Sequence, residues 1–260
     1  MKAESYDITQ FAHTVQTSTQ DGRHWRFIWG HGWGQNKSAL ETLARSLSVL
    51  GSHVLFDFPG FGASPKPDTI WSTADYADLV AIYLKANPHC GPTVWIGYSF
   101  GGRVGIQLSG RHPGLVDQLV LISAAGLPIQ RSLLKRAWIN FKVYTFKALK
   151  RLIPITGMDI NDLRSKFGSV DYKNVGELRE IFVKVINEDL SSVAHKIICP
   201  TLLIYGGKDT ETPPEIGERL AALILDARLS VLSEQDHYSV IGEGRHQVVR
   251  RIHDFLTPCN

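Results

Sequence analysis

A serine between two glycines is the first residue whose surroundings point to chemistry. The segment Gly97-Tyr98-Ser99-Phe100-Gly101 follows an apolar run that predicts a strand, and a helical stretch begins near Arg103. A serine on a sharp, strained strand-to-helix turn exposes its hydroxyl, and glycines keep neighbouring side chains out of that turn. We interpret Ser99 as a nucleophile. The alternative is a glycine-rich turn in which the serine is incidental.

Asp209 and His237 supply the acid and the base that a serine nucleophile needs. Asp209 follows the apolar run 202–205, and His237 lies in the loop after the last apolar run. A carboxylate there can hold the imidazole in the tautomer that accepts the serine proton. The order serine, aspartate, histidine differs from that of chymotrypsin-like and subtilisin-like proteases. Glu211 is the fallback acid, and Asp209 could instead only form a turn.

The segment Gly30-His31-Gly32-Trp33-Gly34 predicts an oxyanion hole. Acyl transfer needs N–H donors aimed at the developing negative charge, and glycines let the backbone approach the substrate. We assign the donors to the backbone N–H groups of Trp33 and Phe100. His31 could compete for the role of base, but a structural hydrogen bond that shapes the loop explains it better. The side chains of Trp33, Phe100 and Tyr238 are expected to line an apolar substrate pocket.

Six apolar runs in the sequence predict the strands that position these residues. Each run is nearly continuous, as in strands buried on both faces, and segments with helical spacing separate them. The runs are 25–29, 54–58, 93–96, 119–122, 201–205 and 229–232. Strands that alternate with helices predict an α/β fold with a mostly parallel central sheet flanked by helices.

The alternation stops at Ala125 and returns after Pro200. Residues 126–192 have helical patterns only, which predicts an inserted helical cap on a core of residues 1–125 and 193–260. Within the cap, residues 131–151 carry Lys and Arg between aromatic and aliphatic side chains, without Asp or Glu. Such a basic amphipathic segment can be the solvated outside of a cap helix, a contact with an anionic membrane, or a dock for an acidic carrier protein or acidic substrate.

Composition narrows the class of protein. The chain has 260 residues, a net charge of +3, and 43% hydrophobic against 20% charged residues, which indicates a globular protein and no nucleic-acid partner. Three cysteines fit a reducing compartment, and neither a signal peptide nor an apolar stretch of membrane-spanning length is evident, so we expect a cytoplasmic protein. We expect no metal and no cofactor, and the oligomeric state stays open.

Five motifs together make the chain resemble the α/β-hydrolase superfamily from about residue 25 to residue 256. They are HGWG at 31–34, DFPGFGAS at 57–64, GYSFGG at 97–102, GGKDTETP at 206–213 and DHYSVIGE at 236–243. The resemblance implies the α/β-hydrolase fold and a structural role for Asp57, which would bond backbone groups in a tight turn. The stretch HGWGQN is similar to a segment of bacterial carboxylesterases that cleave acyl-carrier-protein methyl esters.

The nucleophile and its neighbours narrow the activity that the resemblance implies. A serine at position 99 argues against haloalkane dehalogenases and epoxide hydrolases, which have aspartate there. Tyr98 and Tyr238 replace residues typical of ring-fission carbon–carbon hydrolases. We expect a serine esterase that acts on a small ester with an apolar acyl or alcohol group. The alternatives are a carbon–carbon bond hydrolase and a ligand-binding protein with little turnover on the same fold.

Overall fold

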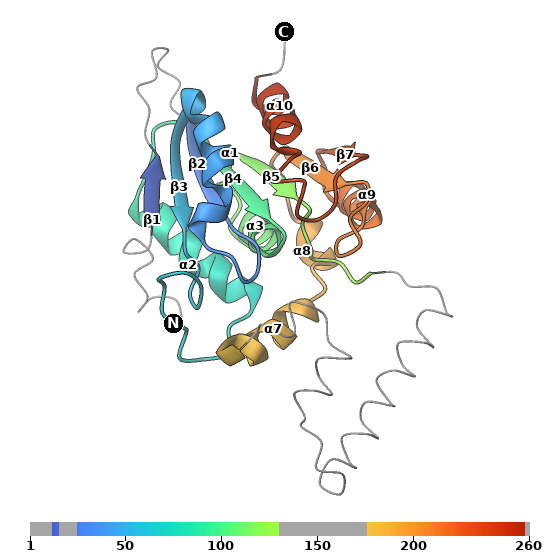
Figure 1. Cartoon of the computed structure of the whole chain (residues 1–260). Coiled ribbons are helices and arrows are strands. Elements are labelled where there is room, and N and C mark those ends of the chain that lie inside the picture. Colours follow the sequence, from blue (N-terminus) through green and yellow to red (C-terminus); the bar gives the residue numbers. More distant parts are fainter. Residues whose placement is uncertain (1–11, 16–24, 130–175, 258–260) are drawn as a thin grey trace, which may run out of the picture.

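A computed structural model describes residues 12–15, 25–129 and 176–257. The sheet in these residues has the strand order β1-β3-β2-β4-β5-β6-β7 (Figure 1). The strands are β1 (Ala12–Val15), β2 (Trp25–Gly30), β3 (Gly51–Phe56), β4 (Thr93–Tyr98), β5 (Gln118–Ile122), β6 (Thr201–Gly206) and β7 (Ala227–Leu232). Strands β2 to β7 are parallel to one another, and β1 pairs antiparallel with β3. The mostly parallel sheet is confirmed, whereas β1 was not predicted.

Helices cover both faces of the sheet (Figure 1). The longer α-helices are α2 (Thr73–Ala86), α3 (Phe100–Arg111), α7 (Arg179–Ile186), α9 (Pro214–Leu223) and α10 (Arg245–Leu256). The shorter helices are η2 (Lys37–Leu40), α1 (Glu41–Ser46), η3 (Ser48–Leu50), η4 (Gly176–Leu178) and α8 (Ser191–Ala194). No helix in the described ranges has both the length and the apolar character to cross a membrane.

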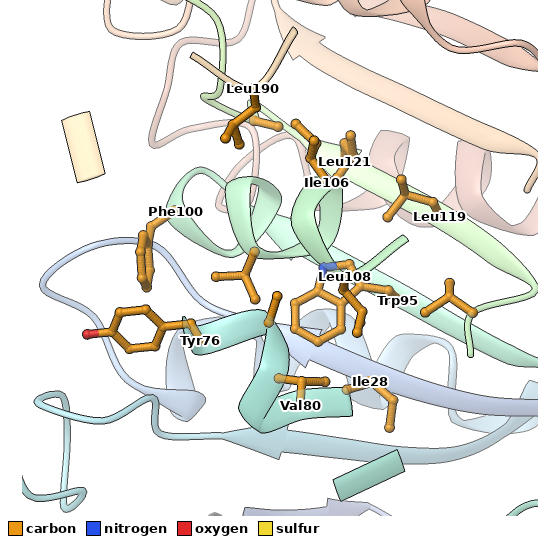
Figure 2. Close-up of a cluster of buried hydrophobic side chains, with 14 of the residues drawn as sticks. Ile28, Tyr76, Val80, Trp95, Phe100, Ile106, Leu108, Leu119, Leu121 and Leu190 are labelled. Carbon is orange, nitrogen blue, oxygen red and sulfur yellow. The ribbon is translucent and has the colours of Figure 1, made fainter. Parts of the chain in front are cut away.

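Alternate residues of each central strand pack into two different cores. Ile28, Trp95 and Leu121 pack with α2, α3 and α9, and Figure 2 shows this cluster around Trp95 and Val80. Trp29 and Ile96 point to the other face, where α1 and α10 lie. Because both faces are covered, these strands are apolar along most of their length, as the sequence predicts, and their polar residues lie at the first positions. The edge strand β7 differs, since several of its residues are partly or fully exposed.

A buried histidine lies in the second core. His53 is fully buried, its ring stacks on Phe27 at 4.5 Å, and its Nδ1 accepts a hydrogen bond from Trp29 Nε1 at 3.0 Å. Its Nε2 lies 3.2 Å from the carbonyl oxygen of Leu47 and is therefore the protonated nitrogen. Burial lowers the pKa of His53 to about 4.

The segment 176–194 packs against loops and helices of the sheet region. Helix α7 packs Phe182 against Trp33, with ring centroids 5.0 Å apart. The carboxylate of Glu188 accepts hydrogen bonds from the backbone N–H of Thr73, at 3.0 Å, and from its hydroxyl. The division into a core of 1–125 and 193–260 and a cap of 126–192 stays a prediction, and the basic segment 131–151 lies outside the described residues.

Candidate active site

The sheet topology explains why residues far apart in the sequence meet. Ser99 follows β4, Asp209 follows β6, and His237 follows β7. These strands are parallel, so their carboxyl ends lie at the same edge of the sheet, where ligands bind in open α/β folds. The structure brings all three predicted residues into hydrogen-bond contact there.

Ser99 sits on a strained turn between β4 and α3. Its φ of 50° and ψ of −105° are rare for a residue with a side chain. A Cβ on Gly101 would lie 2.0 Å from the carbonyl oxygen of Gly30, and a Cβ on Gly97 would lie 2.3 Å from that of Gly101. Because backbone atoms occupy both places, the two glycines are required, as the sequence predicts.

A chain of hydrogen bonds links the three side chains. His237 Nε2 lies 3.1 Å from Ser99 Oγ, and His237 Nδ1 lies 2.8 Å from Asp209 Oδ2. Asp209 and His237 are buried, whereas Ser99 is partly exposed. With the imidazole proton on Nδ1, Nδ1–H donates to the carboxylate and Nε2 is free to accept the serine proton.

Asp209, and not Glu211, faces the imidazole. Asp209 Oδ1 accepts hydrogen bonds from the backbone N–H groups of Glu211, at 2.9 Å, and Thr212, at 2.8 Å. Burial by itself raises the pKa of Asp209, but the hydrogen bonds from His237 and Thr212 outweigh it, so its pKa falls below the ordinary value. The carboxylate of Glu211 is exposed and accepts a hydrogen bond from the Tyr238 hydroxyl at 3.2 Å.

Two polar residues at the site were not singled out for this role from the sequence. Tyr98, whose ring is buried, donates a hydrogen bond from its hydroxyl to the carbonyl oxygen of His237 at 2.8 Å. Thr212 places its hydroxyl beside both Asp209 and His237. The only sequence signal was that Tyr98 precedes the serine and that Thr212 lies three residues after the aspartate.

Of the two residues expected to form the oxyanion hole, Phe100 directly follows the serine. Phe100 is the first residue of α3, so its N–H belongs to the unpaired donors of a helix start. Within the described part of the chain, neither the Trp33 N–H nor the Phe100 N–H takes part in a hydrogen bond. The two aromatic rings contact each other, with centroids 5.3 Å apart. Their role as oxyanion donors stays a prediction.

The three expected pocket residues have different surroundings. Phe100 is buried in the core against Tyr76 (Figure 2), at 5.1 Å between ring centroids. Trp33 is partly exposed and lines a pocket of about 340 Å³ whose other walls are both apolar and polar, and Ser99 and His237 are not among its lining residues. Tyr238 is 53% exposed, and its ring meets the imidazole of His237 edge-on at 5.4 Å. Of these side chains, Trp33 and Tyr238 are the ones accessible to a ligand.

His31 joins two loops and has the structural role that we expected. Its Nε2 accepts a hydrogen bond from the backbone N–H of Phe58 at 3.1 Å, and its Nδ1–H donates to the carbonyl oxygen of Gly32 at 2.8 Å. Burial lowers its pKa to about 4. Asp57 bonds the backbone N–H groups of Lys37 and Ala63, which confirms its predicted role in the turn.

Because two histidines are buried, we expect the protein to lose stability in mild acid. His31 and His53 each have a folded pKa of about 4 against 6.5 for an ordinary histidine. As the pH falls from about 6.5 to 4, the unfolded chain therefore takes up protons that the folded chain does not. We expect a loss of roughly 3 kcal/mol for each residue, measured as a falling free energy of unfolding in urea titrations.

A variant tests the source of this acid sensitivity. His53→Gln should show a shallower decrease of stability with pH than the wild type, whatever its stability at pH 7. If the free energy of unfolding decreased equally steeply with pH in the variant and the wild type, His53 would not contribute to the acid sensitivity.

No group of three His, Cys, Asp or Glu side chains in the described ranges is arranged to hold a metal ion. The hydrogen-bonded side chains of Ser99, His237 and Asp209 are the groups whose geometry supports a reaction. Fold and site together define a hydrolase built on a parallel sheet with a strained serine after a central strand.

The chain belongs to the α/β-hydrolase family, because the model of the "Alpha/beta hydrolase family" matches residues 27–251. A pimeloyl-[acyl-carrier protein] methyl ester esterase of Neisseria meningitidis serogroup B is 29% identical over 223 residues, which cover 80% of this chain and 83% of that protein. A 2-hydroxy-6-oxo-6-(2'-aminophenyl)hexa-2,4-dienoic acid hydrolase of Metapseudomonas resinovorans is 25% identical over 259 residues, covering 92% and 88%.

A solved structure has the same fold. The lipase-esterase related protein from Clostridium acetobutylicum superimposes with a TM-score of 0.70 at 18% identity, covering 94% of this chain and 99% of that one. The fold and the class of enzyme expected from the sequence are confirmed: the protein is a hydrolase whose relatives are esterases and related hydrolases.

Proposed function

We propose that the protein is a serine carboxylesterase that works through an acyl-enzyme on Ser99, His237 and Asp209. The observation that carries the proposal is the continuous hydrogen-bonded chain from Ser99 Oγ through both imidazole nitrogens to Asp209 Oδ2. This geometry provides a nucleophile, a base within 3.1 Å and an acid that orients the base.

The reaction proceeds in two halves. Ser99 Oγ bonds to the ester carbonyl carbon while His237 Nε2 takes the serine proton, and His237 then returns that proton to the departing alkoxide, which leaves as an alcohol. A water molecule next attacks the acyl-enzyme with His237 again as base, which releases the acid and free Ser99. The N–H groups of Trp33 and Phe100 stabilise the oxyanion in both halves.

The substrate we propose is an ester with an apolar acyl or alcohol group. The partly exposed ring of Trp33, which packs on Phe100 next to Ser99, supports that choice. The relative from Neisseria is named for a methyl ester carried on an acyl-carrier protein, so an acyl group on such an acidic carrier is the larger substrate to test. In that case the basic segment 131–151 would be the docking surface.

A carbon–carbon bond hydrolase is the second candidate. The relative from Metapseudomonas resinovorans, named as a dienoic acid hydrolase, matches 92% of this chain and favours this candidate. Ser99, His237 and Asp209 would again be the reacting residues, but the enzyme would cleave a carbon–carbon bond instead of an ester bond.

A fluorophosphonate probe and a pair of substrates test the proposal. We expect the probe to modify Ser99 in the folded protein, located by mass spectrometry of peptides, and short aryl esters to be cleaved faster than a ring-fission dienoate. Faster cleavage of the dienoate would favour the second candidate. Folded protein that neither reacts with the probe nor turns over either substrate would instead indicate a ligand-binding protein.

A further inference from the structure

One threonine hydroxyl contacts the acid, the base and a neighbouring strand end. Thr212 Oγ1 lies 2.9 Å from Asp209 Oδ2, 3.1 Å from His237 Nδ1 and 3.0 Å from the carbonyl oxygen of Ser123, which follows β5. The side chain is 5% exposed. Thr212 therefore joins the two loops of the proposed triad to the end of a third strand.

The chemistry of a hydroxyl restricts what Thr212 can do in this position. A hydroxyl has one proton to donate and two lone pairs that accept. The Ser123 carbonyl and the Asp209 carboxylate can only accept, so the Thr212 proton goes to one of them. A lone pair is then left for the imidazole, and this favours the tautomer with its proton on Nδ1. That tautomer leaves Nε2 free to accept the proton of Ser99.

The backbone at Ser123 shows that its carbonyl is held in place under strain. Ser123 has a φ of 42°, which is uncommon for a serine. Its N–H donates to the carbonyl oxygen of Ile204 at 2.7 Å, which fixes β5 to β6 at this point. The buried Ser123 hydroxyl has no hydrogen-bond partner among the described residues. A strained backbone beside a site is a reason to look for a role, and here the carbonyl reaches Thr212.

We propose that Thr212 is a positioning residue of the Ser99, His237 and Asp209 triad and that its hydroxyl is held between the carboxylate of Asp209 and the strained carbonyl of Ser123. The proposal rests on the proposed function, because it assumes that His237 is the base. The Thr212 hydroxyl contacts Ser123, Asp209 and His237, so Thr212 acts through the position and the tautomer of His237.

Several other groups surround the imidazole and bear on a pH measurement. Asp209 faces it from the loop after β6, and the Tyr98 ring faces it from the end of β4, with the tyrosine ring centroid 5.3 Å away. Asp236 and Tyr238 come from its own loop. Removing the Thr212 hydroxyl leaves all four in place, so a change in the pH profile would report the loss of the hydroxyl itself.

Two substitutions at Thr212 and one control test the proposal. Thr212→Val keeps the shape and removes the hydroxyl, so we expect kcat for an aryl ester to fall about tenfold or more with KM changed less than about twofold. The acidic limb of the pH profile of kcat/KM should also move. Thr212→Ser keeps the hydroxyl and should restore most of kcat and the wild-type profile.

Thr201 offers a matched control. It is fully buried, and its hydroxyl donates to the carbonyl oxygen of Cys199 at 3.0 Å, at the start of β6 and away from the site. Thr201→Val should lose stability but keep the wild-type kcat. If Thr212→Val does not fold, Thr212→Ala provides the same comparison with a smaller side chain.

The outcomes separate this proposal from the proposed function. Wild-type kcat and pH profile in Thr212→Val, in a protein whose turnover depends on Ser99, would overturn the role of Thr212 alone. Equal losses of kcat in Thr212→Val and Thr212→Ser would also overturn it, because they would indicate packing. Turnover that persists in Ser99→Ala would overturn the proposed function itself.

Discussion

Replacing Ser99 with alanine is expected to reduce ester hydrolysis by about a thousandfold to a millionfold. The serine hydroxyl is the atom that bonds to the substrate, and His237 is its hydrogen-bond partner. Alanine removes the nucleophile and keeps the backbone of the turn, where Gly97 and Gly101 fit against fixed backbone atoms. Steady-state kinetics on an aryl ester provides the measurement.

The control for this variant is its stability. Ser99 is partly exposed, and its hydroxyl does not pack in the core, so the thermal unfolding midpoint should stay close to that of the wild type. A folded Ser99→Ala protein that keeps a third of the wild-type activity would exclude Ser99 as the nucleophile.

Replacing Asp209 with asparagine is expected to lower kcat/KM by roughly ten-thousandfold, as in serine protease triads. Two backbone N–H groups donate to Asp209 Oδ1, so the amide oxygen of asparagine must occupy that position. The amide nitrogen then replaces Oδ2 and donates to His237 Nδ1. The imidazole is forced to carry its proton on Nε2, where it can no longer accept the proton of Ser99.

Glu211→Gln is the matched control for this change. It removes one negative charge two residues away, and a glutamine oxygen can still accept the hydrogen bond from Tyr238. We expect kcat/KM within about twofold of the wild type, in line with the low energetic weight of exposed charges. If Glu211→Gln greatly lowered kcat/KM while Asp209→Asn kept nearly the wild-type value, Glu211 and not Asp209 would be the acid.

The central strands and the three site residues could be predicted because their signals are local. An apolar run buried on both faces is visible in the sequence, and residues that follow parallel strands must meet at one edge. Strand β1 escaped prediction because it has only four residues and is defined by antiparallel pairing with β3, some forty residues later in the chain. Its four residues mix polar and apolar side chains, and a segment this short has no hydrophobic pattern that predicts a strand.

The polar contacts around the triad could not be predicted for a different physical reason. Thr212 reaches Ser123, 89 residues away, at a point where the backbone of Ser123 takes a positive φ. Tyr98 reaches the backbone of His237, 139 residues away, across the edge of the sheet. Such bonds depend on the three-dimensional path of several loops, which hydrophobic periodicity does not encode.

The pairing of β5 with β6 has a consequence for how the protein folds. These neighbouring strands are separated in sequence by residues 123–200, so a long loop must close before they can pair. Contacts of such long sequence separation slow folding. Ser99 lies before this loop and Asp209 and His237 lie after it, so a growing chain carries the serine without both partners until residue 237 has been added. If the proposed triad carries the activity, we expect hydrolysis to begin only after β6 and β7 have joined the sheet, and the recovery of activity after dilution from denaturant would report this assembly.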